Sequence, residues 1–88
     1  MGRLTTDSER ESLLLYLYGA CRGKPLPVRL SIKKDELAEF LNLNLRTLYR
    51  RLDSLEAEGL LLRRGGKIEV DAPCYTRIWE EIAELVEP

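Results

Sequence analysis

Apolar residues recur along the chain in blocks that predict four helices, a short strand and a hairpin. A dense apolar block follows an acidic start and predicts a helix over residues 7–21, which Gly19 or Gly23 would end. Prolines restrict the next segment to a short edge strand at residues 28–30, because proline cannot donate a hydrogen bond to a sheet. The last apolar stripe predicts a helix over about residues 75–87.

The first of two central helices is predicted over about residues 33–41. Ser31 is the candidate N-cap, because its hydroxyl can accept a hydrogen bond from a free backbone N–H group at the helix start. Leu37, Phe40 and Leu41 recur at intervals of three and four residues, which places them on one face. We expect that face to be buried in the core.

A three-residue break separates this helix from the second one, predicted over about residues 45–58. Asn42 suits the left-handed conformation that a tight turn between helices requires, and Asn44 is a good N-cap for the following helix. Gly59 indicates the end of the helix. The residues expected on its buried face are Leu48, Leu52 and Leu55.

The segment from about residue 60 to 71 has the pattern of a β-hairpin. Gly65 and Gly66 supply the positive φ angles of a two-residue turn. Two short helices joined by a tight turn form a helix-turn-helix, and the attached hairpin makes it a winged helix. The predicted fold is therefore mainly α with a small β-hairpin. It is a single winged helix-turn-helix domain over residues 1–88, with the helix-turn-helix at about 33–58.

The second helix of the motif has an exposed face with the donors that DNA recognition requires. In a helix-turn-helix this helix enters the major groove, where side chains near its start reach base edges. Arg46 and Arg50 lie one turn apart, and a guanidinium can pair with the O6 and N7 atoms of guanine. Tyr49 lies beside them, so the three are predicted to read bases. The alternative is a solvated helix face whose arginines pair with Asp53 or Glu39.

Cations and short polar side chains around this face are predicted to contact phosphates. Two lysines open the first helix of the motif, short donors lie at the start of the second, and the hairpin tip is basic. Such groups position a protein on a duplex without reading its sequence. For the hairpin, the alternative is an ordinary set of solubilising charges. The predicted phosphate-contacting residues are Lys33, Lys34, Asn44, Thr47, Arg51, Arg63, Arg64 and Lys67.

The formal net charge of −1 hides a polarity along the chain. Residues 22–67 hold 11 Lys+Arg and 6 Asp+Glu, which gives +5, and the remaining residues hold 3 and 9, which gives −6. The basic part contains the turn, the second helix and the hairpin. We therefore expect one face to meet the phosphates of double-stranded DNA, while the acidic ends limit non-specific binding.

The residue types present exclude several other classes of function. The chain has no histidine, which removes histidine acid–base catalysis, Ser-His triads and histidine metal sites. With no metal cluster or phosphate loop in the sequence, we predict no enzyme activity, no metal and no cofactor. No apolar run approaches the length of about 20 residues that spans a membrane, and the protein is predicted to be cytoplasmic. Cys21 and Cys74 are expected to be reduced thiols, with a bridge between them as the alternative.

The last predicted helix carries an apolar stripe beside an acidic face. If the stripe is exposed, the domain is a winged helix used for protein assembly, which is the alternative function. If the stripe packs inward, it belongs to the core of the domain itself. The residues of this candidate partner surface are Tyr75, Ile78, Trp79, Ile82 and Val86.

The central residues resemble the winged helix of the Crp/Fnr family of bacterial transcription regulators. The segments 35–41, 46–52 and 55–61 carry the resemblance, which extends over about residues 8–71. It implies a C-terminal DNA-binding domain that acts as a homodimer on a near-palindromic operator. Family members also have an N-terminal ligand-sensing β-roll and a long dimerisation helix, and this chain has neither. It is therefore expected to be either an excised domain or a short stand-alone regulator.

The base-reading pattern of the family is matched only in part. Its usual Arg and Glu fall on Leu45 and Arg46, while its last Arg falls on Arg50 and is retained. The resemblance thus implies the docking mode of the family but not its target sequence. The other departures, in the turn, at the helix entry and after the retained arginine, are Asn42, Asn44, Lys33 and Arg51.

Overall fold

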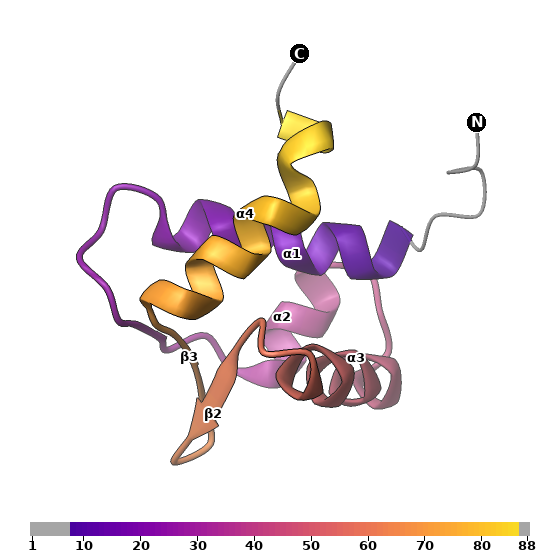
Figure 1. The fold of residues 1–88 in the computed structure, drawn as a ribbon. Coiled ribbons are helices and arrows are strands. Elements are labelled where there is room, and N and C mark those ends of the chain that lie inside the picture. Colours follow the sequence, from indigo (N-terminus) through magenta and orange to yellow (C-terminus); the bar gives the residue numbers. More distant parts are fainter. Residues whose placement is uncertain (1–7, 87–88) are drawn as a thin grey trace.

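The computed structural model describes residues 8–86, and their side chains as far as residue 83. In this part of the chain, helices and strands follow one another in the predicted order (Figure 1). The fold class is confirmed as a mainly helical winged helix-turn-helix. The elements are α1 (Ser8–Cys21), β1 (Val28–Leu30), α2 (Lys34–Phe40), α3 (Leu45–Ala57), β2 (Leu62–Arg64), β3 (Lys67–Val70) and α4 (Ala72–Val86).

The three strands form one antiparallel sheet in the order β1–β3–β2. Gly65 and Gly66 join β2 to β3, and their φ angles of 57° and 80° are those that the tight turn requires. β1 pairs with the other edge of β3, so Arg29 lies opposite Glu69. The sequence predicts β1 correctly but not this pairing, because a three-residue strand carries too little pattern to identify its partner.

The turn between α2 and α3 is built by two asparagines, as predicted. Asn42 has a φ of 60°, the left-handed conformation that asparagine tolerates. The side-chain oxygen of Asn44 accepts a hydrogen bond from the backbone N–H of Thr47 at 2.8 Å, which caps α3. The buried face of α3 is the predicted one, with Leu48, Leu52 and Leu55.

The first helix of the motif, α2, is shorter than predicted and differs in two places. Ser31 is not its cap, since the N-cap position is Lys33, whose side chain makes no capping hydrogen bond. Leu37 is buried as predicted, but Phe40 exposes 69% of its surface. The small Ala38 takes an inward position beside Leu37, and this turns Phe40 away from the core.

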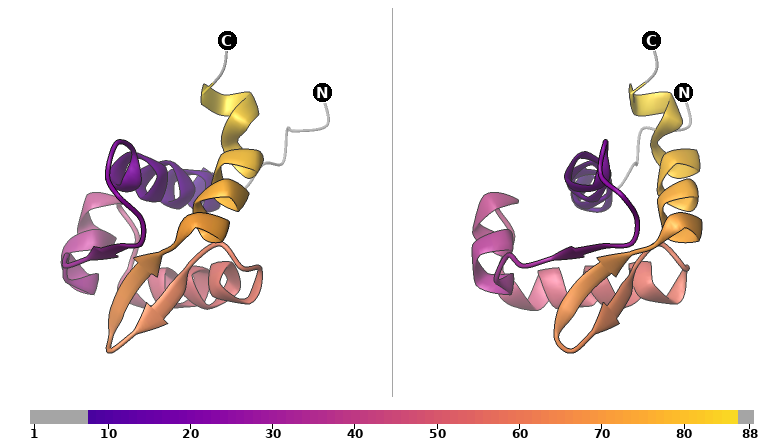
Figure 2. Two further views of the ribbon diagram at one scale, coloured as in Figure 1. Left: turned by 60° about the vertical axis from the view of Figure 1, so that its left-hand side comes forward. Right: turned by 90° about the vertical axis from the view of Figure 1, so that its left-hand side faces the viewer.

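The first helix, α1, lies above α3 and between α2 and α4 (Figure 2). It continues through Gly19 to Cys21, so of the two glycines predicted to end it, Gly19 does not. Leu17 and Cys21 are buried on either side of that glycine, and this packing outweighs its weak helix propensity. Gly23, which follows the helix, has a φ of 77° and turns the chain toward β1.

The last helix, α4, begins earlier than predicted, at Ala72. The carboxylate of Asp71 accepts a hydrogen bond from the backbone N–H of Cys74 at 3.0 Å and caps the helix. The same hydrogen bond holds the pKa of Asp71 below its usual value. Pro73 falls in the first turn, where a missing N–H costs nothing. The predicted end of the helix and the side chain of Val86 lie outside the described residues.

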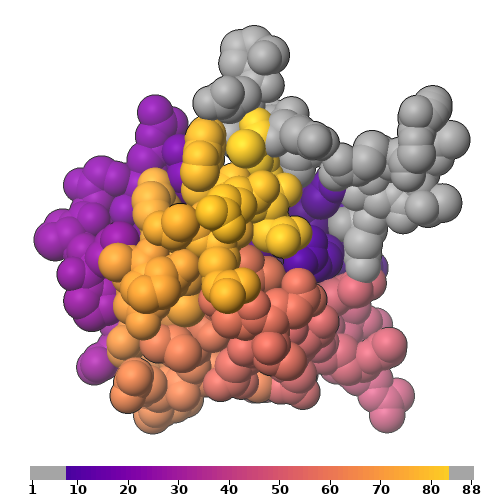
Figure 3. Space-filling model, in the orientation of Figure 1, coloured from indigo at the N-terminus to yellow at the C-terminus, as the bar shows by residue number. Residues whose placement is uncertain are grey.

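A cluster of apolar side chains fills the space between the helices and the sheet. α1 packs against α4, and α2 packs against α3. Outside this core, α3 and the β2–β3 hairpin form a continuous surface below α4 (Figure 3). The large side chains that are fully buried are Leu13, Leu14, Leu17, Leu37, Leu48, Leu52, Leu55, Leu60, Leu61, Ile68, Ile78 and Ile82.

Candidate nucleic-acid interface

The outer face of α3 presents the three residues predicted to read bases. Arg46, Tyr49 and Arg50 are all exposed, whereas the opposite face of the helix is packed into the core. The cap at Asn44 fixes where the helix begins, and α2 packs against the helix. The structure therefore brings the three side chains to one exposed face, on a helix whose position is fixed by its buried leucines.

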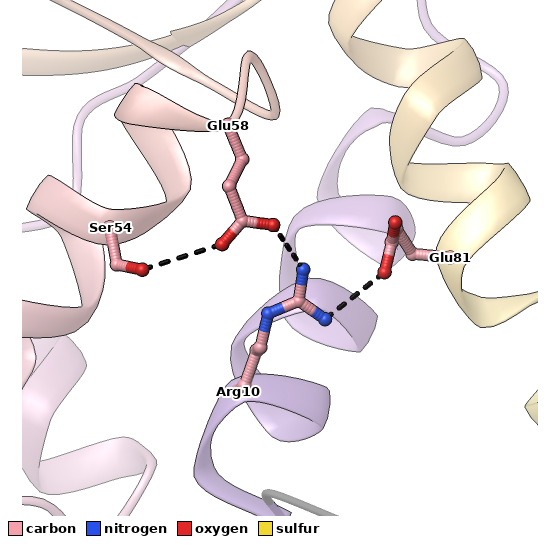
Figure 4. A network of polar contacts seen from close by, with 4 residues as sticks. All are labelled: Arg10, Ser54, Glu58 and Glu81. Atoms are coloured by element: carbon pink, nitrogen blue, oxygen red, sulfur yellow. Dashed lines mark hydrogen bonds and ion pairs between the residues drawn. The ribbon is translucent and has the colours of Figure 1, made fainter.

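Acidic side chains near the end of α3 are occupied by arginines from other elements. Arg63 of β2 binds both Asp53 and Glu56. Arg10 of α1 binds Glu58 at 2.6 Å and also reaches α4, and Ser54 donates a hydrogen bond to the same Glu58 (Figure 4). Among the described residues, neither Arg46 nor Arg50 forms an ion pair with a carboxylate. The alternative in which Asp53 pairs with Arg46 or Arg50 is wrong, because the Asp53 carboxylate forms its ion pair with Arg63.

These ion pairs further favour the charged form of both partner arginines. Burial disfavours the charge of Arg63, but its hydrogen bonds to the two carboxylates outweigh burial and raise its pKa above the ordinary value. Burial likewise disfavours the charge of Arg10, and its hydrogen bonds to Glu58 and Glu81 raise its pKa. The negative charge at the end of α3 is thereby compensated inside the protein. The exposed start of the helix is left positive.

A hollow borders α3 on each side. The first has a volume of 300 Å³ and lies toward the start of α1, with Thr47, Arg50 and Arg51 in its lining. The second has a volume of 490 Å³ and lies between the starts of α2 and α3 and the hairpin tip, with Lys33 and Lys67 in its lining. A helix in the major groove has a sugar–phosphate strand on either side. The two basic hollows match that arrangement.

Four of the predicted phosphate-contacting cations have partners inside the protein, and they are Lys34, Arg51, Arg63 and Arg64. Besides Arg63, the guanidinium of Arg51 donates to Glu9 at 3.0 Å. The ammonium of Lys34 donates to the backbone carbonyl of Gly66 at 2.6 Å. Lys33 and Lys67 are exposed. Two further predicted residues, Asn44 and Thr47, lie at the start of α3, where the cap uses the oxygen of Asn44 and leaves its NH₂ group available.

Arg29 is not among the residues predicted from the sequence, but the β1–β3 pairing places it on the same surface as the hairpin. Glu69 accepts from Arg29 at 3.3 Å with one oxygen and pairs with Arg64 at 3.4 Å with the other. The carboxylate side chain is 9% exposed, while the two arginine side chains are 62% and 63% exposed. One buried carboxylate therefore orients two exposed guanidiniums. No signal in the sequence could identify this set, because it depends on the strand register.

The apolar stripe of α4, considered as a possible partner surface, packs inward over its described residues. Ile78 and Ile82 are fully buried, because they face α1 in the core. Tyr75 and Trp79 are half-buried and stack on Tyr18 of α1, with ring centroids 5.5 and 5.7 Å apart. The stripe therefore forms the contact between α4 and α1, which is the second of the two interpretations considered for it.

The described part of the chain holds neither a candidate metal site nor a reactive thiol. No group of side chains there could hold a metal ion, and no helix there is long and apolar enough to cross a membrane. Cys21 and Cys74 are free and buried, as expected for reduced thiols. Burial raises the pKa of Cys21, and burial with the side chain of Asp71 raises the pKa of Cys74 to about 11. Raised pKa values make both thiols poor nucleophiles.

The supported helix, its capped start and the basic hairpin beside it define a winged helix-turn-helix, a class of domain that sets its second motif helix against DNA. The family model of the Crp-like helix-turn-helix domain matches residues 12–74. The chain therefore belongs to this family of non-enzymatic DNA-binding domains of transcription regulators. Searches among curated proteins and among solved structures gave no significant match.

Proposed function

We propose that this domain binds double-stranded DNA in a sequence-specific manner, with α3 in the major groove and the β2–β3 hairpin on the adjacent backbone or minor groove. The observation that carries the proposal is the charge arrangement of α3. Its outward arginines have no acidic partner among the described residues, while the carboxylates near its end are bound by Arg63 and Arg10. A helix face that contacts only solvent does not require its arginines to be kept apart from its carboxylates in this way.

Base reading is assigned to the start of α3. Arg46 and Arg50 each carry a guanidinium that can bind guanine O6 and N7 together, and Tyr49 between them can contact a phosphate or a thymine methyl. Because Arg46 and Arg50 are four residues apart on a helix, they reach bases about one helical turn of protein, or 5–6 Å, apart. The proposed readout is therefore of neighbouring base pairs within one half-site.

Phosphate contacts are assigned to the two hollows and to the wing surface, which consists of the exposed arginines Arg29 and Arg64. Lys33 and Lys67 line the second hollow. The start of α3 contributes the amide of Asn44 and the hydroxyl of Thr47. The wing surface contributes Arg64 and, as an addition from the strand register, Arg29. Of the cations with internal partners, Arg51 is bound to Glu9 through Nε and Nη2, so its charge is already partly compensated.

The test begins with selection from a random-sequence duplex library, followed by fluorescence anisotropy on the selected site at several salt concentrations. The logarithm of the affinity should fall linearly with the logarithm of the salt concentration, with a slope of about −0.9 per phosphate contacted. An affinity that is independent of salt, or a selection without any enriched sequence, would overturn the proposal.

A pair of variants separates base recognition by Arg50 from non-specific electrostatic attraction to DNA. Arg50→Ala should weaken binding to the selected site by about 1–3 kcal/mol and relax the preference at one base pair. Arg22→Ala removes the same charge from an exposed position beyond the end of α1 and is the matched control. If both variants lose the same affinity on every sequence, Arg50 is not a base-reading residue.

The functional form is proposed to be a homodimer in the cytoplasm. One winged helix covers one half-site, and two copies on half-sites about 34–36 Å apart would match a near-palindromic operator. Light scattering of the complex with a full operator and with a single half-site checks this. Two copies on the full operator and one on the half-site are expected, and one copy on both would contradict it. A sensor domain elsewhere in the functional protein is part of the same proposal.

A further inference from the structure

We propose that the wing, meaning the β2–β3 hairpin, is locked onto the helix-turn-helix by two tethers, and that Arg63 and Lys34 are positioning residues rather than phosphate contacts. One tether holds the base of the hairpin to α3, and the other holds its tip to the start of α2. This proposal rests on the proposed DNA binding for its consequence, but the tethers themselves belong to the free protein.

The first tether joins β2 to the outer side of α3. Arg63 Nε and Nη2 donate to one oxygen of Glu56 at 3.1 and 3.0 Å, and Nη2 also donates to Asp53. The two carboxylates are three residues apart, so they stand on neighbouring positions of the same helix face. The Arg63 side chain is 25% exposed, which is far less than that of Arg64 at 63%. One guanidinium thus bridges two elements and has few donors left for DNA.

The second tether joins the tip of the hairpin to α2. The ammonium of Lys34, the first residue of α2, donates to the carbonyl oxygen of Gly66 at 2.6 Å. This short charge-assisted hydrogen bond closes the wall of the hollow that also contains Lys33 and Lys67. A glycine pair is the most flexible part of a hairpin. The hydrogen bond to Gly66 therefore restrains the most flexible segment of the hairpin.

The first tether also masks charge. Asp53 lies three residues after Arg50 and seven after Arg46, so it shares the outward face of α3 with the proposed base-reading residues. An uncompensated carboxylate there would repel the phosphates of the duplex. Arg63 supplies the compensating charge from the wing. Positioning of the wing and positive character of α3 are thus coupled through one side chain.

The tip tether is tested first in the free protein, without DNA. Heteronuclear NOE values and amide hydrogen exchange at Gly65, Gly66 and Lys67 report the order of the tip. Lys34→Met should lower the NOE values and speed exchange there, because it removes the donor. Lys34→Arg, which keeps a donor, should restore much of the order. Lys33→Met is the matched control, since Lys33 has no such bond among the described residues, and it should change neither readout.

DNA binding then separates positioning from phosphate contact. Loss of one charge-assisted hydrogen bond predicts that Lys34→Met weakens binding about fivefold to tenfold. A positioning role leaves the salt slope near that of the wild type, whereas loss of a phosphate contact lowers its magnitude by about 0.9. Lys33→Met, at a proposed phosphate contact, should show that lower slope. An ordered tip in Lys34→Met, or a lower slope in that variant, would overturn the tip tether.

A mutant cycle tests the first tether. Arg63→Met and the pair Asp53→Asn/Glu56→Gln each break the same bridge, so their combination should weaken wing order and DNA affinity no more than Arg63→Met does alone. Additive losses would overturn the tether, because they would mean that Arg63 acts on DNA independently. If wild-type protein binds no duplex at all, the proposed function fails, while the NMR results still decide whether the tethers exist.

Discussion

Phe40 is an aromatic residue whose surroundings differ from those that its spacing suggests. It is 69% exposed, and its ring meets Tyr16 edge-on with centroids 5.5 Å apart. Leu37, one turn earlier on α2, is fully buried. Both residues have the spacing expected for one buried helix face, yet only Leu37 is shielded from water. Their contributions to stability should therefore differ.

We predict that Phe40→Ala lowers the free energy of unfolding by about 1 kcal/mol or less, the value of a partly exposed aromatic pair. Leu37→Ala should lower it by about 2–5 kcal/mol, because it leaves a cavity in the core. Urea denaturation followed by circular dichroism measures both. A loss from Phe40→Ala as large as that from Leu37→Ala would show that the ring is buried in solution.

The thiol of Cys74 gives a prediction for alkaline pH. Burial, with the side chain of Asp71, raises its pKa to about 11 in the folded state, whereas the pKa of an unfolded cysteine is about 8.5. The unfolded chain thus loses its proton first, so the stabilising effect is fully present below the unfolded pKa and is lost as pH rises toward 11. The stability of the wild type should fall over this window.

The comparison variant is Cys74→Ala, which lacks the titrating group and packs a smaller side chain in its place. Its stability should change less between pH 8 and about 10.5 than that of the wild type, whatever its absolute value. Urea denaturation at a series of pH values measures the slope. Equal slopes for the two proteins would mean that the thiol ionises at its ordinary pKa when folded.

At the scale of elements, the parts that the sequence predicts are those with local signals. The cap at Asn44, the left-handed Asn42 and the Gly65–Gly66 turn each fix a boundary through the conformation of one or two residues. The three leucines of α3 give its orientation in the same way. For the candidate site, this was enough to place Arg46, Tyr49 and Arg50 on one exposed face.

The remaining features depend on contacts between distant segments. The pairing of β1 with β3, which brings Arg29 to the wing surface, follows from a register that three residues cannot encode by themselves. The partners of Arg63 come from a neighbouring helix, so a basic hairpin tip and a hairpin bonded back to α3 have the same sequence pattern. α4 begins earlier than its apolar stripe suggests, because the cap at Asp71 acts outside that stripe.

Arg10 connects three helices, and its removal gives a prediction at this scale. It binds Glu58 at the end of α3 and Glu81 of α4 from its place in α1 (Figure 4). Arg10→Met should lower the free energy of unfolding by about 1 kcal/mol, since two partly buried charge-assisted bonds are lost while the stem can still pack. The difference from wild type should shrink at about 1 M salt, which screens the wild-type pairs.

The matched control for that prediction is Arg22→Met, which removes the same charge from an exposed residue outside the helices. It should change stability by about 0.5 kcal/mol or less. Thermal denaturation at low and high salt measures all three proteins. An Arg10→Met loss that is the same at both salt concentrations would mean that the arginine acts through packing and not through its two ion pairs.

At the scale of the whole molecule, the basic surface of α3 and the hairpin tip lies apart from the acidic last helix. α3 and the hairpin tip lie at one end of the molecule, and α4 lies toward the other (Figures 1 and 2). Interactions between exposed charges are largely screened beyond a Debye length of about 10 Å at 0.1 M salt. The acidic residues of α4 should therefore act weakly on a duplex held against α3.

Two charge reversals of equal size test this separation. Asp35→Lys and Glu80→Lys each change the net charge from −1 to +1, but Asp35 lines the hollow beside the hairpin tip while Glu80 is exposed on α4. If the placement of charge governs binding, Asp35→Lys should tighten binding to a random-sequence duplex several-fold at about 0.1 M salt, and Glu80→Lys should change it little. At about 0.01 M salt the Debye length grows to about 30 Å, so the two variants should converge. Equal tightening at the higher salt would instead mean that the duplex approaches α4 as closely as α3, which the proposed docking of α3 in the major groove does not allow.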